Sequence, residues 1–148
     1  MPDAAEPHGE WQARALSAGA AGTWEWDRGT GIVEWDPALE ALYGLEPGSF
    51  GGSLEDWLAL VHPGDRDEVL ARLEETIASS SGHFLLFRAV RPDGAVRWIE
   101  SRGRVRRTAD GEVLGIAGVC HDVTDRHVAE RKLWALEQRA RERLEFLA

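Results

Sequence analysis

The chain of 148 residues contains a single cysteine, Cys120, and no long run of apolar residues. One cysteine excludes an internal disulfide and is typical of a reducing compartment. No segment approaches the ~18 apolar residues that a membrane-spanning helix needs, and the N-terminus lacks the basic and apolar regions of a signal peptide. These absences predict a cytoplasmic protein, or a soluble part of a larger one, with no membrane insertion.

Positive charge is also scarce, because 17 Lys and Arg residues stand against 26 Asp and Glu, for a net charge of −9. Residues 125–148 hold 6 basic and 5 acidic residues, so the rest of the chain has 11 against 21, or −10. Such an acidic body disfavours a nucleic-acid or anionic-membrane surface. The hydrophobic content of 43% and the charged content of 29% are those of an ordinary globular domain.

Periodicity and turn residues predict an α+β domain in which two strands, several short helices, three strands and a long helix follow one another. Strands are expected at residues 22–27, 32–36, 83–90, 95–105 and 112–123, with turns at 91–94 and 108–111 that make the last three a meander. Helices are expected at Glu10–Ala18, Pro37–Tyr43, Leu54–Leu60, Asp65–Ser79 and from Asp125 onward. Asp36 before Pro37, and Ser53 with Asp56, are helix-start signals.

Four stretches, "GTWEWD", "HPGDR", "FRAVRPDGAVRWIESRGRV" and "GVCHDVTDRHVAERKL", together resemble the PAS family of sensory domains over about residues 20–130. The most specific parts are the "PDG" turn with Trp98 four residues after Gly94, and "DVTDRH", which is similar to the Asp-Ile-Thr ending of many PAS domains. The resemblance implies a five-stranded antiparallel sheet with short helices over one face, a small cavity between them, and a terminal helix that carries a signal to an effector. It divides the chain into an N-terminal flanking helix (1–19), a core domain (20–124) and a C-terminal signalling helix of coiled-coil type (125–148).

No cofactor, metal or catalytic activity is expected. Light-sensing PAS domains that bind flavin need a cysteine in an Asn-Cys-Arg setting on a central helix, and residues 43–79 contain none. The long helix 65–79 has no histidine for haem, and His62 in "HPGD" is expected to cap and pack. The histidine spacing fits no zinc pattern, and no nucleophile–base pair or phosphate-binding loop occurs. An unknown small ligand remains possible.

The inward face of the sheet is the candidate ligand pocket. Alternation along the last three strands places these residues on it: Leu85, Phe87, Ala89, Ile99, Ser101, Gly103, Ile116, Gly118 and Cys120. Small side chains on a core face either admit closely packed helices or leave a void for a ligand, and both possibilities stay open. This face is expected to carry no ionisable group, which disfavours an enzyme on a similar scaffold such as the ketosteroid-isomerase-like fold.

The opposite face combines arginines with an apolar stripe of dimer-contact candidates, Phe84, Leu86, Trp98 and Val119. Arg88, Arg97, Arg102, Arg104, Arg106 and Arg107 are expected to form a solvated face paired with nearby acids. The apolar stripe implies cover by the helix Glu10–Ala18, by a second subunit, or by both. A homodimer is therefore expected, and a constitutive dimer scaffold without ligand is the alternative to a sensor.

The last strand runs into the last helix with no glycine or proline between them. Asp122 and Thr124 are expected to cap this helix, so that Asp122, Val123 and Thr124 form a signal relay. A heptad seam with one polar defect at Arg143 follows, formed by Ala129, Leu133, Leu136, Ala140 and Leu147. One interpretation is that the helix folds back on its own sheet. The favoured interpretation is that it pairs with the same helix of a second copy and regulates a C-terminal effector of histidine kinase or phosphatase type.

Overall fold

The computed structural model describes residues 22–79 and 82–147, so the predicted helix Glu10–Ala18 lies outside the described residues. The five strands are β1 (Gly22–Asp27), β2 (Val33–Trp35), β3 (Gly82–Val90), β4 (Val96–Arg107) and β5 (Val113–Asp122). The helices are α2 (Pro37–Leu42), α3 (Leu54–Leu58), the 3₁₀ helix η1 (Pro63–Asp65), α4 (Arg66–Ser79) and α5 (Thr124–Leu147). The predicted α+β class and element order are confirmed.

The strands form one antiparallel sheet in the order β2-β1-β5-β4-β3. The predicted meander of β3, β4 and β5 is confirmed. The hairpin of β1 and β2 extends the sheet beyond β5, because β1 pairs with β5. This pairing sets Trp24 opposite Gly118, while Ser101 lies opposite Cys120 in the neighbouring pair of strands. Residues from both ends of the domain thereby meet at the middle of the sheet.

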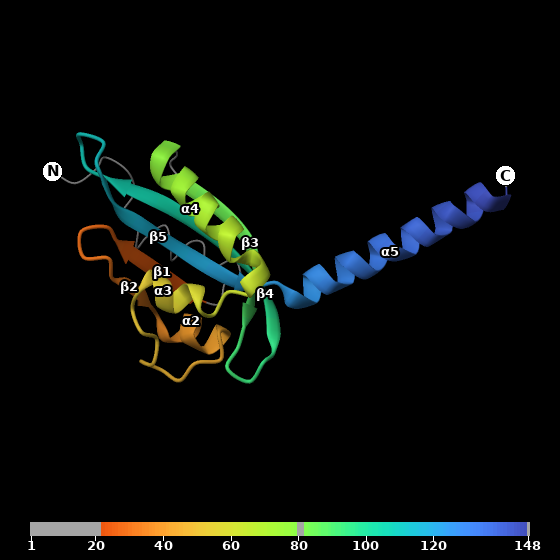
Figure 1. The fold of residues 1–148 in the computed structure, drawn as a ribbon, viewed down its shortest axis with the longest axis horizontal. Coiled ribbons are helices and arrows are strands. Elements are labelled where there is room, and N and C mark those ends of the chain that lie inside the picture. Colours follow the sequence, from red (N-terminus) through yellow and green to blue (C-terminus); the bar gives the residue numbers. More distant parts are fainter. Residues whose placement is uncertain (1–21, 80–81, 148) are drawn as a thin grey trace.

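The short helices start where the sequence signals lie. The Asp36 carboxylate accepts a hydrogen bond from the Leu39 amide at 2.8 Å, and the Ser53 hydroxyl accepts one from the Asp56 amide at 3.1 Å. The predicted capping role of His62 is also confirmed, since its Nδ1 accepts from the Gly64 amide at 3.0 Å. Helices α2, α3 and α4 lie over one face of the sheet, and α5 leaves the domain as an isolated rod (Figure 1).

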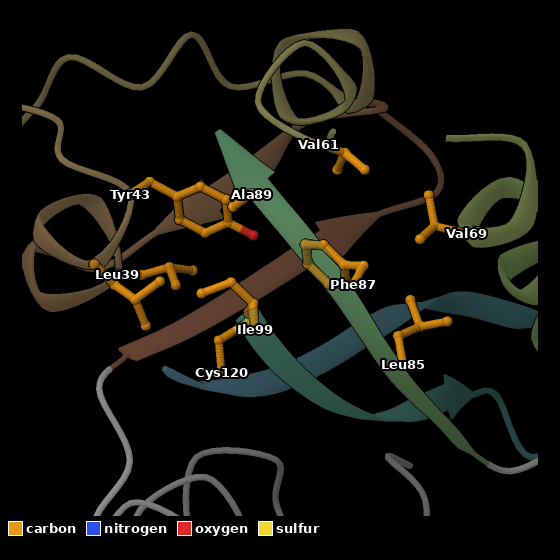
Figure 2. Packing of buried hydrophobic residues seen from close by; sticks show 10 residues of the cluster. Leu39, Tyr43, Val61, Val69, Leu85, Phe87, Ala89, Ile99 and Cys120 are labelled. Atoms are coloured by element: carbon orange, nitrogen blue, oxygen red, sulfur yellow. The ribbon is translucent and has the colours of Figure 1, made fainter. Parts of the chain in front are cut away.

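The core lies between these helices and the sheet (Figure 2). Leu39 on α2 and Tyr43, the C-cap residue of α2, pack in one cluster with Phe87 on β3 and Ile99 on β4, and each is at most 1% exposed. The predicted inward residues Leu85, Phe87, Ala89, Ile99 and Cys120 all belong to this cluster. The assignment of these five residues to the core-facing side of the sheet is therefore confirmed.

On the opposite face, fewer residues of the predicted apolar stripe are exposed than expected. Val119 is 0% exposed within one chain, so its assignment to a dimer face is wrong: a side chain already buried cannot contact a second subunit. Phe84 and Leu86 are 50% and 43% exposed, and Trp98 is half-buried. Three of the predicted arginines pair with acids: Arg88 with Asp65 at 2.7 Å, Arg97 with Asp122 at 2.7 Å and Arg102 with Glu100 at 3.2 Å.

Candidate functional site

A cavity of about 180 Å³ opens between the sheet and the helices. The sheet contributes ten of the described lining residues, Trp24, Trp26, Val33, Trp35, His83, Leu85, Phe87, Ser101, Ile116 and Cys120. The helices and the C-cap of α2 contribute the others, Leu39, Tyr43, Leu54, Trp57, Leu70, Leu73, Glu74 and Ile77. Every strand, together with α2, α3 and α4, therefore takes part in the cavity.

The nine predicted pocket residues divide into three groups. Five line the cavity, namely Leu85, Phe87, Ser101, Ile116 and Cys120. Ala89 and Ile99 are 0% exposed and pack in the closed part of the core instead. Gly103 and Gly118 lie beneath aromatic rings: a Cβ on Gly103 would meet the His83 ring at 2.8 Å, and one on Gly118 would collide with the Trp24 ring. The inward face of the sheet therefore includes both closely packed core residues and residues that line the cavity.

Sequence reasoning missed the aromatic walls of the cavity, Trp24, Trp26, Trp35, Tyr43 and Trp57. The alternation of "GTWEWD" does place Trp24 and Trp26 on one side of β1, which was a usable signal. The pairing of β1 with β5 then puts Trp24 over the sheet, where its ring stacks on His83 with centroids 5.4 Å apart. Because these strands are nearly a hundred residues apart in sequence, no local pattern indicates that contact.

The cavity does contain ionisable side chains, contrary to expectation, but burial keeps three of them neutral. Burial lowers the pKa of His83 to about 4, so the imidazole is uncharged at neutral pH. Burial also raises the pKa of Tyr43 well above its usual value and that of Cys120 to about 12. The Cys120 thiol, which is buried and lies opposite Ser101 in the sheet, is therefore an unreactive packing group. Glu74 is exposed on α4.

A second cluster joins the sheet to α5. The Asp122 carboxylate accepts hydrogen bonds from the Thr124 amide at 3.0 Å and from the Thr124 hydroxyl at 2.6 Å, while Arg97 Nε donates to it at 2.7 Å. Burial opposes the charge on Asp122, but the hydrogen bonds from Arg97 and Thr124 outweigh it and lower the pKa. The predicted capping by Asp122 is confirmed. The predicted capping by Thr124 is wrong, because Thr124 is itself the first residue of α5 and its hydroxyl accepts a hydrogen bond from the Trp98 amide at 2.8 Å.

Two further contacts hold the first turn of α5 against β4, and neither was predicted. Arg126 Nη2 donates to the Glu100 carboxylate at 2.7 Å, and the His127 ring packs on Trp98 with centroids 4.0 Å apart. Glu100 is 7% exposed; burial disfavours its charge, yet hydrogen bonds from Arg126 and Arg102 leave its pKa lowered. We name the contacts of Asp122, Thr124, Arg126 and His127 with β4 the junction.

Beyond the junction, α5 buries no residue. The predicted seam residues are all exposed, with Leu133 and Leu136 each 59% exposed. The helix therefore does not fold back on its sheet (Figure 1). Within residues 22–79 and 82–147, no three His, Cys, Asp or Glu side chains are grouped to hold a metal, and no helix is long and apolar enough to cross a membrane.

A helix-covered antiparallel sheet with an internal cavity and a projecting terminal helix defines a class of small sensory domains, and known proteins agree with it. The family model described as "PAS fold" matches residues 32–120, more than half of the chain. The chain therefore belongs to the PAS family.

Solved structures similar to this chain come from signalling proteins. A sensory box histidine kinase/response regulator from Burkholderia thailandensis is 29% identical, with a TM-score of 0.74 over 88% of this chain and 97% of that chain. The N-terminal domain of a diguanylate cyclase with PAS/PAC sensor from Marinobacter aquaeolei is 30% identical, with a TM-score of 0.65 over 72% of this chain and 97% of that one.

A curated relative, the sensor protein FixL from Bradyrhizobium diazoefficiens, is 25% identical over 123 residues, or 81% of this chain. A methyl sulfide methyltransferase-associated sensor from Methanosarcina acetivorans is 28% identical over 59% of this chain. The chain spans 24% and 9% of the lengths of these two proteins.

Proposed function

We propose that this domain is a cytoplasmic sensory and dimerisation module, without catalysis of its own, that regulates an effector joined to the end of α5. Its cavity receives the input and its junction passes the change to the helix. The names of the similar proteins, which include sensors, a histidine kinase and a diguanylate cyclase, support a role in bacterial signal transduction. A histidine kinase type of effector is the one we favour.

The observation that carries this proposal is the junction. A ligand shifts an equilibrium only through differential affinity for two states, so a sensor needs an element with two arrangements. The sheet wall of the cavity includes Ser101 on β4 and Cys120 on β5, and the same two strands supply Trp98, Glu100 and Asp122 to the junction. A shift of these strands on binding therefore moves the base of α5.

The cavity also supports a sensor over a ligand-free scaffold. A packed core leaves few voids larger than a water molecule, because empty space forfeits dispersion contacts. A cavity of about 180 Å³ surrounded by large aromatic side chains is well beyond that limit. We take it to be kept for a ligand.

The test is Thr124→Ala in a fusion that joins residues 1–148 through α5 to a histidine kinase catalytic domain, with the heptad register retained. Losing the hydroxyl that bridges Trp98 and Asp122 removes interactions of the size of a helix cap, ~0.5–2 kcal/mol. That is small beside a domain stability of ~5–15 kcal/mol but comparable to allosteric coupling of ~1–3 kcal/mol. We expect kinase activity to lose its response to stimulus while the domain melts nearly normally.

Asp122→Ala should have the same effect on switching with a larger loss of stability, because Asp122 also pairs with Arg97. The matched control is Asp110→Ala in the exposed turn after β4, which should switch as the parent does. Normal switching in both junction variants would show that these residues only terminate a strand, and the relay would be abandoned.

A further inference from the structure

The shape and lining of the cavity indicate which molecules it can accept. Its walls include six aromatic side chains, Trp24, Trp26, Trp35, Tyr43, Trp57 and Phe87. Two of them, Trp57 and Phe87, already meet edge to face with centroids 5.6 Å apart. Flat side chains that enclose a space favour a flat apolar molecule, which can stack on one ring and meet another edge-on.

The volume limits this molecule to one ring. An apolar protein cavity of about 150 Å³ holds benzene, whereas sites for drug-sized ligands measure about 300–1,000 Å³. At about 180 Å³, the cavity admits a benzene ring with one small substituent. A haem or a flavin ring system is too large for it.

The charge states of the residues that line the cavity exclude a charged ligand. His83, Tyr43 and Cys120 are neutral, so an anion or a cation would leave water without a buried partner of opposite charge. Glu74, the remaining acid in the described lining, is exposed to solvent on α4 and would repel an anion.

One polar group in the cavity has capacity to spare. The Tyr43 hydroxyl accepts a hydrogen bond from Trp57 Nε1 at 3.1 Å, and its own hydrogen makes no hydrogen bond within the described part of the chain. Tyr43 is 1% exposed, and its ring extends from the C-terminal end of α2 with its oxygen directed towards β3 (Figure 2). A buried donor without an acceptor is costly, so a ligand oxygen placed there gains a hydrogen bond with little competition from water.

We propose that the cavity binds a neutral aromatic molecule of one ring with a single hydrogen-bond acceptor, such as an aryl ketone or aldehyde, which accepts from the Tyr43 hydroxyl. This assignment rests on the proposed function, since binding of that molecule is the sensed input. It gives each wall of the cavity a role: the aromatic rings select a flat ring, and Tyr43 selects the acceptor.

Isothermal titration calorimetry of the 148-residue chain with four probes tests the proposal. Acetophenone carries ring and acceptor, ethylbenzene lacks the acceptor, benzoate is an anion and benzylammonium is a cation. We expect acetophenone to bind with a Kd of about 0.01–1 mM, as a ligand of that size can. Benzoate and benzylammonium should bind at least about tenfold more weakly, and tighter binding of either ion than of acetophenone would overturn the proposal.

Tyr43→Phe tests the acceptor. A single neutral hydrogen bond predicts that the preference for acetophenone over ethylbenzene falls about 3- to 10-fold in this variant. The ratio of two affinities measured on one variant cancels any general effect on folding. Cys120→Ala, which alters the lining but not the hydroxyl, is the matched control and should keep the parent ratio. An unchanged ratio in Tyr43→Phe would remove Tyr43 from ligand recognition and overturn the proposal.

The failure of this proposal can be told apart from failure of the sensory function. If none of the four probes binds, yet the basal activity of the kinase fusion differs between Thr124→Ala and the control Asp110→Ala, the ligand class is wrong and the sensory function stands. If acetophenone binds as expected but leaves the activity of the kinase fusion unchanged, the ligand class stands and the sensory function is wrong.

Discussion

At the scale of single residues, glycines on the sheet leave room for large rings that lie over them. Gly118 leaves room for the Trp24 ring, and Gly103 for the ring of His83. The two rings then stack, nearly parallel at 12°, and form part of the floor of the cavity. Glycine is required here by close approach and not by backbone conformation.

The buried imidazole of His83 makes stability depend on pH. An unfolded histidine titrates near pH 6.5, whereas the folded His83 has a pKa of about 4. Between these values the unfolded chain binds more protons, so the free energy of unfolding falls as the pH decreases from about 6.5 to about 4. This one group accounts for a loss of roughly 2 kcal/mol between pH 7 and pH 5.

Urea unfolding at pH 7 and pH 5 measures that loss, and His83→Gln should reduce it by most of this amount. Burial also lowers the pKa of His121, on the opposite face, so His121→Gln is run beside it to separate the two contributions. A His83→Gln profile as steep as that of the parent would contradict a neutral buried His83.

At the scale of elements, the feature that matters is how α5 is attached. The first turn of the helix touches β4 through a hydroxyl, an ion pair and a ring contact, and the rest of the helix has no buried residue in the described chain. A helix without tertiary contacts is marginal in water, so the junction sets both its direction and the stability of its first turns.

Arg126→Ala should loosen that attachment without unfolding the domain. It leaves the buried Glu100 carboxylate with Arg102 as its remaining ion-pair partner in the described chain. We expect faster hydrogen exchange at the amides of residues 126–130, with the amides of β4 unchanged except beside Glu100. Lys132→Ala, nearly two turns further along the exposed helix, is the control. Equal exchange in both variants would show that the ion pair does not hold the helix.

At the scale of the whole molecule, a folded body carries a rod of roughly 36 Å, the length of a 24-residue helix. Large apolar side chains are exposed along it, among them Leu144 at 69% and Phe146 at 89%. Exposed apolar side chains in such number favour association, and the heptad spacing of the seam favours a second copy of the same helix. Phe84 and Leu86 on β3 remain candidates for a second contact.

Charging the seam should therefore separate the subunits. In sedimentation velocity we expect the parent chain to be a dimer, and the double variant Leu133→Glu, Leu136→Glu to be a monomer with an unchanged thermal midpoint for the core. Arg139→Glu adds negative charge outside the seam and should remain dimeric. A parent chain that sediments as a monomer at high micromolar concentration would contradict pairing through α5.

The amino-acid sequence by itself determined what depends on neighbours in the chain. Helix starts at Asp36 and Ser53, the turns after β3 and β4, and the alternation that separates the two sheet faces are local effects of capping, turn chemistry and side-chain direction. For the same reason the strand-to-helix passage at Asp122 could be predicted, and so could the buried state of Cys120.

Only the tertiary structure decided what depends on residues far apart in the chain. The pairing of β1 with β5 placed the Trp24 ring over Gly118, where the sequence had left both a closed core and a void open. It also brought Trp24 and Trp26 into the cavity wall, which no local pattern indicates. Packing between elements also buried Val119, and the contact of α5 with β4 joined Arg126 to Glu100. Such contacts arise from strand order and packing, which periodicity cannot specify because it describes the face of an element and not the neighbour that covers it.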